Sequence, residues 1–244
     1  LYKNKMLGKS NIIILYLFIF LFQNSFMASD IKENYIKALF YLHQKNEDIS
    51  LSDLGEELKV SKPSASDMIH KLQKEEIVIS KKYKPIRITE KGKQQAALII
   101  RKHRLSEIFL AQIMKFGWEE VHEIAEELEH IKMDKFFDRM DELMGFPTTD
   151  PHGSPIPDKN GNFNKPNYNQ LSQATLKSTV IVKALRDSSV EFLLFLNNKE
   201  IQLNTKITIT HVESFDKSLT VSYDNYTDVV LSKTICDRIL IEEI

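Results

Sequence analysis

Six histidine and glutamate side chains stand at spacings typical of a metal site. They are His103, Glu107, His122, Glu126, Glu129 and His130. Residues four apart on a helix project from one face, so the first two share a face and the other four, at i, i+4, i+7 and i+8, share another. Carboxylates gathered without a cation repel one another and resist desolvation. The pattern therefore predicts a centre for one or two divalent cations, against the alternative of a solvated acidic face.

The donor types limit which metals the site would bind and which classes of protein it could belong to. Oxygen and nitrogen donors without a thiolate suit Mn²⁺ or Fe²⁺ and do not exclude Zn²⁺. The single cysteine, Cys236, excludes an internal disulfide framework and a cysteine-rich zinc module. Di-metal oxidases repeat Glu-x-x-His on two helices, whereas here this spacing, as at Glu127 and His130, occurs only within the single helix predicted over residues 118–131. With no glycine-rich phosphate loop and no nucleophile elbow, we expect a protein that is not an enzyme.

Charge divides the middle of the chain into two blocks. Residues 59–102 hold 12 basic and 4 acidic side chains, and residues 103–150 hold 5 basic and 12 acidic ones, although the whole chain of 244 residues has a net charge of −1. Adjacent blocks of opposite sign indicate two neighbouring tasks, binding an anion with the first block and a cation with the second.

The elements around the basic block are those of a winged helix-turn-helix. Apolar residues recur at helical spacing over residues 30–43, a capping pattern starts a second helix at Ser50, and Ser61 with Pro63 starts a third. Two short strands with a cationic turn between them follow over residues 77–89. This order and the excess of Lys and Arg favour DNA binding, since such residues displace counterions from phosphates. The alternative is a small helical domain with a solvated basic face.

The remaining patterns complete the expected fold class, which is mainly α with a small β domain. Helices are predicted over residues 90–115, 118–131 and 134–144, and a short one over 189–197. About five strands between residues 180 and 241 predict a small β-barrel. The expected domains are a winged helix-turn-helix at 27–92, a helical metal-binding and dimerisation domain at 93–146, a linker rich in Pro, Gly and Asn at 147–172, and the barrel at 173–244.

Residues 1–26 form an apolar N-terminal extension. Residues 12–22 are an unbroken apolar run that follows three lysines, as in a signal peptide, but the run is too short to span a bilayer. Met27 opens a well-formed cytosolic sequence. We expect the extension to be an over-extended gene start, with a membrane-directed segment as the alternative, and leave it out of the fold argument.

Five stretches of the sequence resemble the diphtheria-toxin-repressor family of metal-dependent transcriptional regulators, in particular the manganese transport regulators. They are Glu33–Leu39, Ser61–Ser66, Arg101–Glu107, Val121–His130 and Pro151–Pro157, the last containing the run His-Gly-Ser-Pro-Ile-Pro. The resemblance implies an N-terminal winged helix, a helical dimerisation domain with two neighbouring metal sites, and a C-terminal FeoA-like barrel.

The resemblance also implies ligand sets. His103, Glu107 and His122 resemble the ligands of one site, and Glu126, Glu129 and His130 resemble those of the other, to which Asn34 of the first helix would add an amide oxygen. Iron-sensing relatives have Cys at the position of Glu126, so a harder oxygen donor favours Mn²⁺, with Fe²⁺ as the alternative and up to two ions per subunit. The DNA-binding residues expected in the recognition helix and the wing are Ser61, Pro63, Ser64, Ser66, Lys81, Lys82 and Lys84.

The function expected from these features is a homodimeric repressor in the cytoplasm that binds a palindromic operator when Mn²⁺ is present. Its targets would be metal-uptake genes, and no small-molecule substrate or membrane is expected for residues 27–244. One alternative is a winged-helix regulator of an organic ligand in which the metal site is structural. Another is a metal-storage or di-metal oxidase module with an incidental basic face.

Overall fold

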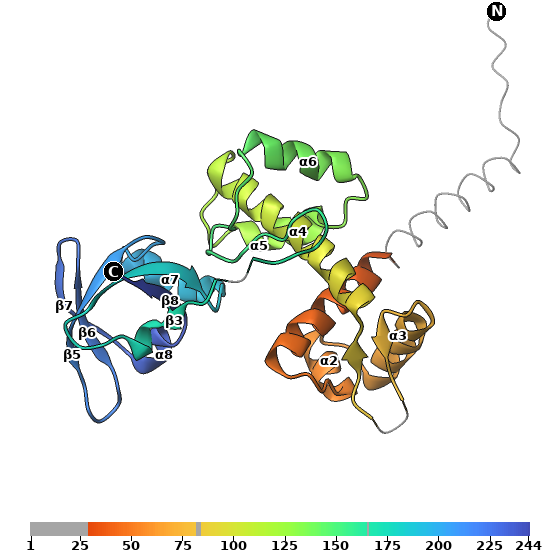
Figure 1. Cartoon of the computed structure of the whole chain (residues 1–244), viewed down its shortest axis with the longest axis horizontal. Helices are drawn as coiled ribbons and strands as arrows, with labels where there is room; N and C mark the ends of the chain where they lie inside the picture. Colours follow the sequence, from red (N-terminus) through yellow and green to blue (C-terminus); the bar gives the residue numbers. More distant parts are fainter. Residues whose placement is uncertain (1–28, 82–83, 165) are drawn as a thin grey trace, which may run out of the picture. The chain divides into compact units, whose positions relative to one another are not determined.

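The computed structural model describes residues 29–81, 84–164 and 166–244, and these divide into two compact units (Figure 1). The first unit ends at Ile99 and the second begins at Ile100, so the boundary falls inside helix α4 (Glu90–Gln112). The expected extension at residues 1–26 and the expected DNA contact Lys82 lie outside the described residues. Among the helices that are described, none has the length and apolar character needed to cross a membrane.

The first unit has the expected helix-turn-helix and ribbon. Residues 29–45 are helical, and α2 (Leu51–Glu57), α3 (Lys62–Lys74), β1 (Val78–Ile79) and β2 (Arg87–Ile88) follow. Ser50 and Asp53 form a capping box at α2, as the sequence predicts. Antiparallel pairing of β1 with β2, and a bridge between Ile49 and Ile86, attach the ribbon to the helices. Leu39, Leu54 and Leu72 are fully buried and supply the core between the helices.

The second unit begins with the acidic helices. The C-terminal part of α4 is followed by α5 (Val121–Leu128) and α6 (Asp134–Leu143). The prediction of one helix over residues 118–131 was too long, because Trp118–Glu120 form a turn before α5 and Glu129–His130 form another after it. Helix α4 ends three residues earlier than predicted, and Lys115 has a φ of 65°, which a helix cannot continue through.

The C-terminal part of this unit is an antiparallel sheet covered by helices. Its six strands have the order β3-β8-β4-β5-β6-β7. The strands are β3 (Asn169–Gln170), β4 (Thr179–Leu185), β5 (Lys206–Val212), β6 (Leu219–Tyr223), β7 (Tyr226–Leu231) and β8 (Ile239–Glu243). Helix α7 (Val190–Asn198) packs Phe192, Leu193 and Leu196 into the sheet core, while α8 (Lys233–Cys236) precedes β8. The five expected strands are present. The edge strands β3 and β7 are not paired with each other within the described residues.

The segment expected to be a linker over residues 147–172 is in part packed into the fold. Asp150, His152 and Ile156 are buried. The β4–β8 ladder shifts register between Val182 and Ala184, and at this bulge the loop lies against β4, with the Leu185 N–H donating to the His152 carbonyl at 2.9 Å. Gly153 makes the approach possible, because a Cβ there would lie 2.6 Å from Ala184 Cα and its φ is +83°. The polar and turn-forming residues of this segment thus include a loop that packs against the fold.

Candidate metal centre and nucleic-acid interface

His103 lies at the middle of the candidate metal centre. It projects from α4 together with Glu107, one turn later, and both side chains are buried. The imidazole Nε2 lies 3.0 Å from Glu107 Oε1, and Nδ1 lies 2.7 Å from Glu129 Oε2, both within hydrogen-bond distance. Glu129 follows directly after α5 and is fully buried. One ring therefore links carboxylates from two segments of the chain.

His122 joins the first predicted ligand set. It projects from α5, and its Nδ1 lies 3.3 Å from Glu107 Oε1 while its Nε2 lies 3.6 Å from Glu126 Oε1. Donor atoms of His103, Glu107 and His122 all lie within 4.8 Å of one another, so the structure brings this expected set together. The His122 side chain is half exposed, which gives the cluster an opening to solvent.

The second predicted set is arranged differently from the expectation. Glu126 and Glu129 gather with His103, and donor atoms of these three residues lie within 4.8 Å of one another. His130 is adjacent, with Nε2 at 4.0 Å from Glu129 Oε1. The two predicted sets therefore share His103. Asn34 belongs to the first unit, where its Oδ1 atom is buried and has no hydrogen-bond partner among the described residues.

Two residues that the sequence reasoning missed, Asp150 and His152, complete a third cluster with Glu107. All three are buried, with donor atoms within 4.8 Å of one another. His152 Nε2 donates to the Trp118 carbonyl at 2.9 Å, so in a neutral ring Nδ1 is the atom with the lone pair, and it lies 4.0 Å from Glu107 Oε2. Metal–ligand bonds of about 2 Å place two donors about 3–4 Å apart, which matches this separation. The signal available in the sequence was the His-Gly-Ser-Pro-Ile-Pro run.

The loop that carries these two residues is held rigidly. Asp150 Oδ1 accepts hydrogen bonds from the backbone N–H groups of His152 and Ser154 at 2.8 and 2.9 Å, which closes a tight turn. The Arg104 Nε atom lies 3.5 Å from Asp150 Oδ2, and its guanidinium also donates to the Pro155 carbonyl. These contacts fix the Asp150 carboxylate in the cluster with Glu107 and His152.

The buried carboxylates have opposite pKa shifts. Burial opposes ionisation of Glu107, but hydrogen bonds from His103 and His122 and the charges of its histidine neighbours outweigh it, so the pKa of Glu107 is far below its ordinary value. Burial, and then repulsion from Glu107, raises the pKa of Asp150 despite the attraction of Arg104. A charged Glu107 beside a carboxyl that resists ionisation is an arrangement that an added positive charge stabilises.

The donor set fits a divalent cation that prefers oxygen and imidazole nitrogen. Four carboxylates and at least three imidazoles meet at Glu107 and Glu129. No thiolate takes part, because Cys236 is buried in the sheet core, where burial raises the pKa of its thiol to about 12. The clusters thus suit Mn²⁺ or Fe²⁺ better than a soft metal.

The first unit presents the candidate DNA surface along α3. Ser61 Oγ accepts from the Ser64 N–H at 3.3 Å and begins the helix, and Pro63 stands in its first turn. Ser61, Pro63 and Ser64 are exposed and Ser66 is half-buried, so this end of α3 faces solvent. Lys81 and Lys84 are exposed at the tip of the ribbon. These expected contacts share one unit and are accessible.

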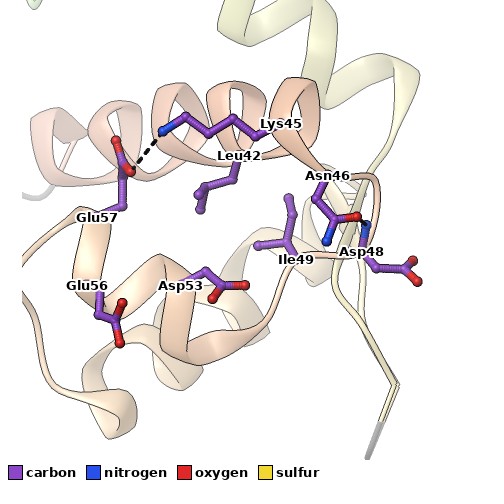
Figure 2. A pocket seen from close by; sticks show the side chains of 8 residues that line it. All are labelled: Leu42, Lys45, Asn46, Asp48, Ile49, Asp53, Glu56 and Glu57. Carbon is purple, nitrogen blue, oxygen red and sulfur yellow. Dashed lines mark hydrogen bonds and ion pairs between the residues drawn. The ribbon is translucent and has the colours of Figure 1, made fainter. Parts of the chain in front are cut away.

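The first unit also has a pocket of about 520 Å³ whose charged lining residues, unlike those of the candidate DNA surface, are mainly acidic (Figure 2). Its lining includes Asp48, Asp53, Glu56 and Glu57. Figure 2 shows Lys45 reaching Glu57, at 3.7 Å, and Asp48 is paired with Arg87 at 2.9 Å. Asp53 is used in the α2 capping box. Its acidic lining repels phosphate, which disfavours DNA binding at this pocket.

Three family models match the chain in succession. Residues 27–86 match the iron-dependent repressor N-terminal DNA-binding domain, residues 89–158 its metal-binding and dimerisation domain, and residues 169–243 the FeoA domain. The regulator MntR of Bacillus pumilus is 31% identical over 120 residues, which cover 49% of this chain and 83% of that protein. The chain belongs to the iron-dependent repressor family.

Other members of the iron-dependent repressor family are also similar to this chain in sequence or structure. The repressor IdeR of Mycobacterium bovis is 30% identical over 128 residues, which are 52% of this chain but only 56% of that protein. A solved manganese-dependent transcriptional repressor in complex with manganese superposes with a TM-score of 0.77 at 28% identity, covering 87% of this chain and all of the other. These family members are transcriptional repressors and not enzymes, so the family excludes the oxidase alternative.

Proposed function

We propose that this protein is a homodimeric Mn²⁺-dependent repressor that binds a palindromic operator and controls genes of metal uptake. It would act in the cytoplasm, where its operator lies. The observation that carries the proposal is the group of buried carboxylates and imidazoles around His103 and Glu107, located in the part of the chain that matches the family's metal-binding domain. Such a group is stable when a cation neutralises it.

The residues divide between two ions in this proposal. Glu107 and His122, with Asp150 and His152, would hold one ion, and Glu126, Glu129 and His130, with the amide of Asn34, would hold the other. His103 lies between them and is available to either. Each ion supplies positive charge that stabilises ionised carboxylates held close together. Both sets consist of oxygen and imidazole nitrogen donors without a thiolate, which supports Mn²⁺ and keeps Fe²⁺ as the alternative.

A dimer surface is available on the helical part of the second unit. Met133, Phe136, Leu143 and Phe146, along and beside α6, are exposed apolar side chains. Solvent-exposed apolar groups of this size on one helix are typical of a protein interface. A two-fold symmetric dimer would present two α3 helices. The operator would then be palindromic, because its two half-sites would mirror that symmetry, with their centres one helical turn apart.

Regulation would follow from differential binding. The metal-bound chain would favour the arrangement of α3 helices that matches the operator, and by reciprocity operator DNA would tighten metal binding. Exposed lysines of the ribbon would bind phosphates, while the start of α3 would meet base edges in the major groove.

The test is operator binding measured by fluorescence anisotropy with residues 27–244 and labelled DNA from upstream of a metal-uptake gene. Anisotropy is expected to rise on adding Mn²⁺, to rise on adding anaerobic Fe²⁺ at equal or higher concentration, and to return with a chelator. The double variant Glu126→Ala/His130→Ala should lose metal-dependent binding. Glu127→Ala, an exposed neighbour outside the clusters, should keep it. Operator binding indifferent to metal would overturn the proposal and favour a regulator of an organic ligand.

A further inference from the structure

We infer that Trp118 and Asn197 are positioning residues that hold His152 in place for metal binding, and so couple the metal site to the seating of the C-terminal sheet domain. The inference rests on the proposed metal site at Glu107, Asp150 and His152. It concerns two side chains that are not ligands and that lie 79 residues apart in the sequence.

Trp118 contacts His152 in two ways. Its backbone carbonyl accepts the His152 Nε2 proton at 2.9 Å, and the other ring nitrogen, Nδ1, faces Glu107 at 4.0 Å. Its indole ring stacks on the imidazole with centroids 6.0 Å apart and planes inclined by 25°. The hydrogen bond selects the tautomer and the stacking fixes the plane of the ring. Partners of this kind behind a ligating histidine orient the ligand and raise its basicity.

Trp118 is held in turn by Asn197, at the C-terminal end of α7. The indole Nε1 donates to Asn197 Oδ1 at 2.8 Å, and Asn197 Nδ2 donates to Glu119 Oε2 at 3.1 Å. The single amide is therefore hydrogen-bonded to two residues, Trp118 and Glu119, of the turn that precedes α5. Trp118 also packs against the core of the sheet domain.

The sheet domain reaches His152 by a second route. The Leu185 N–H, at the end of β4, donates to the His152 carbonyl at 2.9 Å. The His152 ring is thus fixed by Trp118, and its backbone is fixed by β4. Both contacts depend on the sheet domain being packed in place, because Asn197 and Leu185 belong to it. A filled site would favour the seated domain, and a displaced domain would weaken the site.

The test uses the amide, because Trp118 is the only tryptophan and is kept as an optical reporter. Asn197→Ala removes both hydrogen bonds of the clamp. Asn198→Ala, the same change at the next and exposed position of α7, is the matched control. Mn²⁺ binding is measured by calorimetry and by the electron paramagnetic resonance of free Mn²⁺, and the Trp118 emission is recorded in parallel.

Asn197→Ala should lower the affinity for one of the two Mn²⁺ ions about tenfold. This is the low end of the range for loss of a residue that supports a ligand. The second ion should keep its affinity. The Trp118 emission should change as the weakened ion binds. In the background His152→Gln, this emission change should be absent and Asn197→Ala should have little further effect, since the clamp acts through that imidazole.

Equal Mn²⁺ affinities for Asn197→Ala and Asn198→Ala would overturn the inference. So would a loss in Asn197→Ala that persists unchanged in the His152→Gln background, because the amide would then act on general stability. Circular dichroism checks the folding of each variant, and Asn197→Asp, which keeps an acceptor for the indole, should show an intermediate loss. Failure of the proposed function is seen separately, as absence of metal-dependent operator binding in the unaltered chain.

Discussion

Ser61 stabilises α3 and at the same time faces solvent where operator DNA is expected. Ser61→Ala removes the cap on the Ser64 N–H and should lower the free energy of unfolding by about 1 kcal/mol. It should also weaken operator binding, because the start of α3 is part of the proposed interface. Urea denaturation and anisotropy measure the two effects.

Ser50→Ala provides the comparison, since Ser50 caps α2 through Asp53 in the same unit. We expect a similar loss of stability and unchanged operator affinity at saturating Mn²⁺. Equal weakening of operator binding in both variants would mean that Ser61 acts through helix stability alone.

The side chains of the metal centre were predictable only in part. The spacing of His103 and Glu107 places them on one face of α4, and the structure confirms that they contact each other at 3.0 Å. His152 was not predictable from spacing, because it reaches Glu107 through a folded loop and not along a helix. The position of a loop depends on tertiary contacts that no local periodicity encodes.

Among the elements, the 150–157 loop is the one whose docking can be tested most directly. Gly153→Ala would force a Cβ against the Lys183 carbonyl and Ala184, at a backbone φ of +83° that alanine rarely adopts. The loop should move away from β4, and the Leu185 bond to His152 should be lost.

We expect Gly153→Ala to unfold at lower temperature and to weaken Mn²⁺ binding at the ion held by His152, by tenfold or more. Gly145→Ala is a comparison at a similar φ of +73° with open space around the Cβ, so it shares the backbone strain without the collision. Differential scanning calorimetry measures the unfolding temperature of each variant, and a Mn²⁺ titration measures its metal affinity. Identical metal affinities in the two variants would show that the loop contact with β4 does not support the site.

Helix and strand order followed from the sequence, whereas the ends of elements did not. Capping residues at Ser50 and Ser61 fixed two helix starts correctly. The helix predicted over residues 118–131 contains no such stop signals, and its true start follows the turn at Trp118, which Asn197 holds from another part of the chain. The sheet was foreseen from period-two patterns, but not the bulge in β4 that receives the loop.

At the scale of the whole molecule, metal removal separates a sensor from a protein that needs its metal to fold. The apolar cores of the two units do not include the clusters, so we expect the chelated protein to remain folded and dimeric while operator binding is lost. Mn²⁺ at a hundred times its Kd should add about 2.7 kcal/mol of stability and raise the Tm.

Circular dichroism, analytical ultracentrifugation and anisotropy on the same chelated sample make the comparison. Unfolding or dissociation on chelation would instead identify a structural metal, in line with the alternative of a regulator that senses an organic ligand. Operator binding that survives chelation would contradict the dependence on metal.

The position of His103 between two carboxylates limits how the centre can fill. The ring nitrogens Nε2 and Nδ1 lie 3.0 Å from Glu107 Oε1 and 2.7 Å from Glu129 Oε2. A neutral imidazole has a single lone pair, so the ring can bind a cation with one nitrogen only and donates to a carboxylate with the other. Two ions cannot both take this ring as a ligand, so the ion that loses the competition must be held by its other donors alone, and the order of filling is decided at one imidazole.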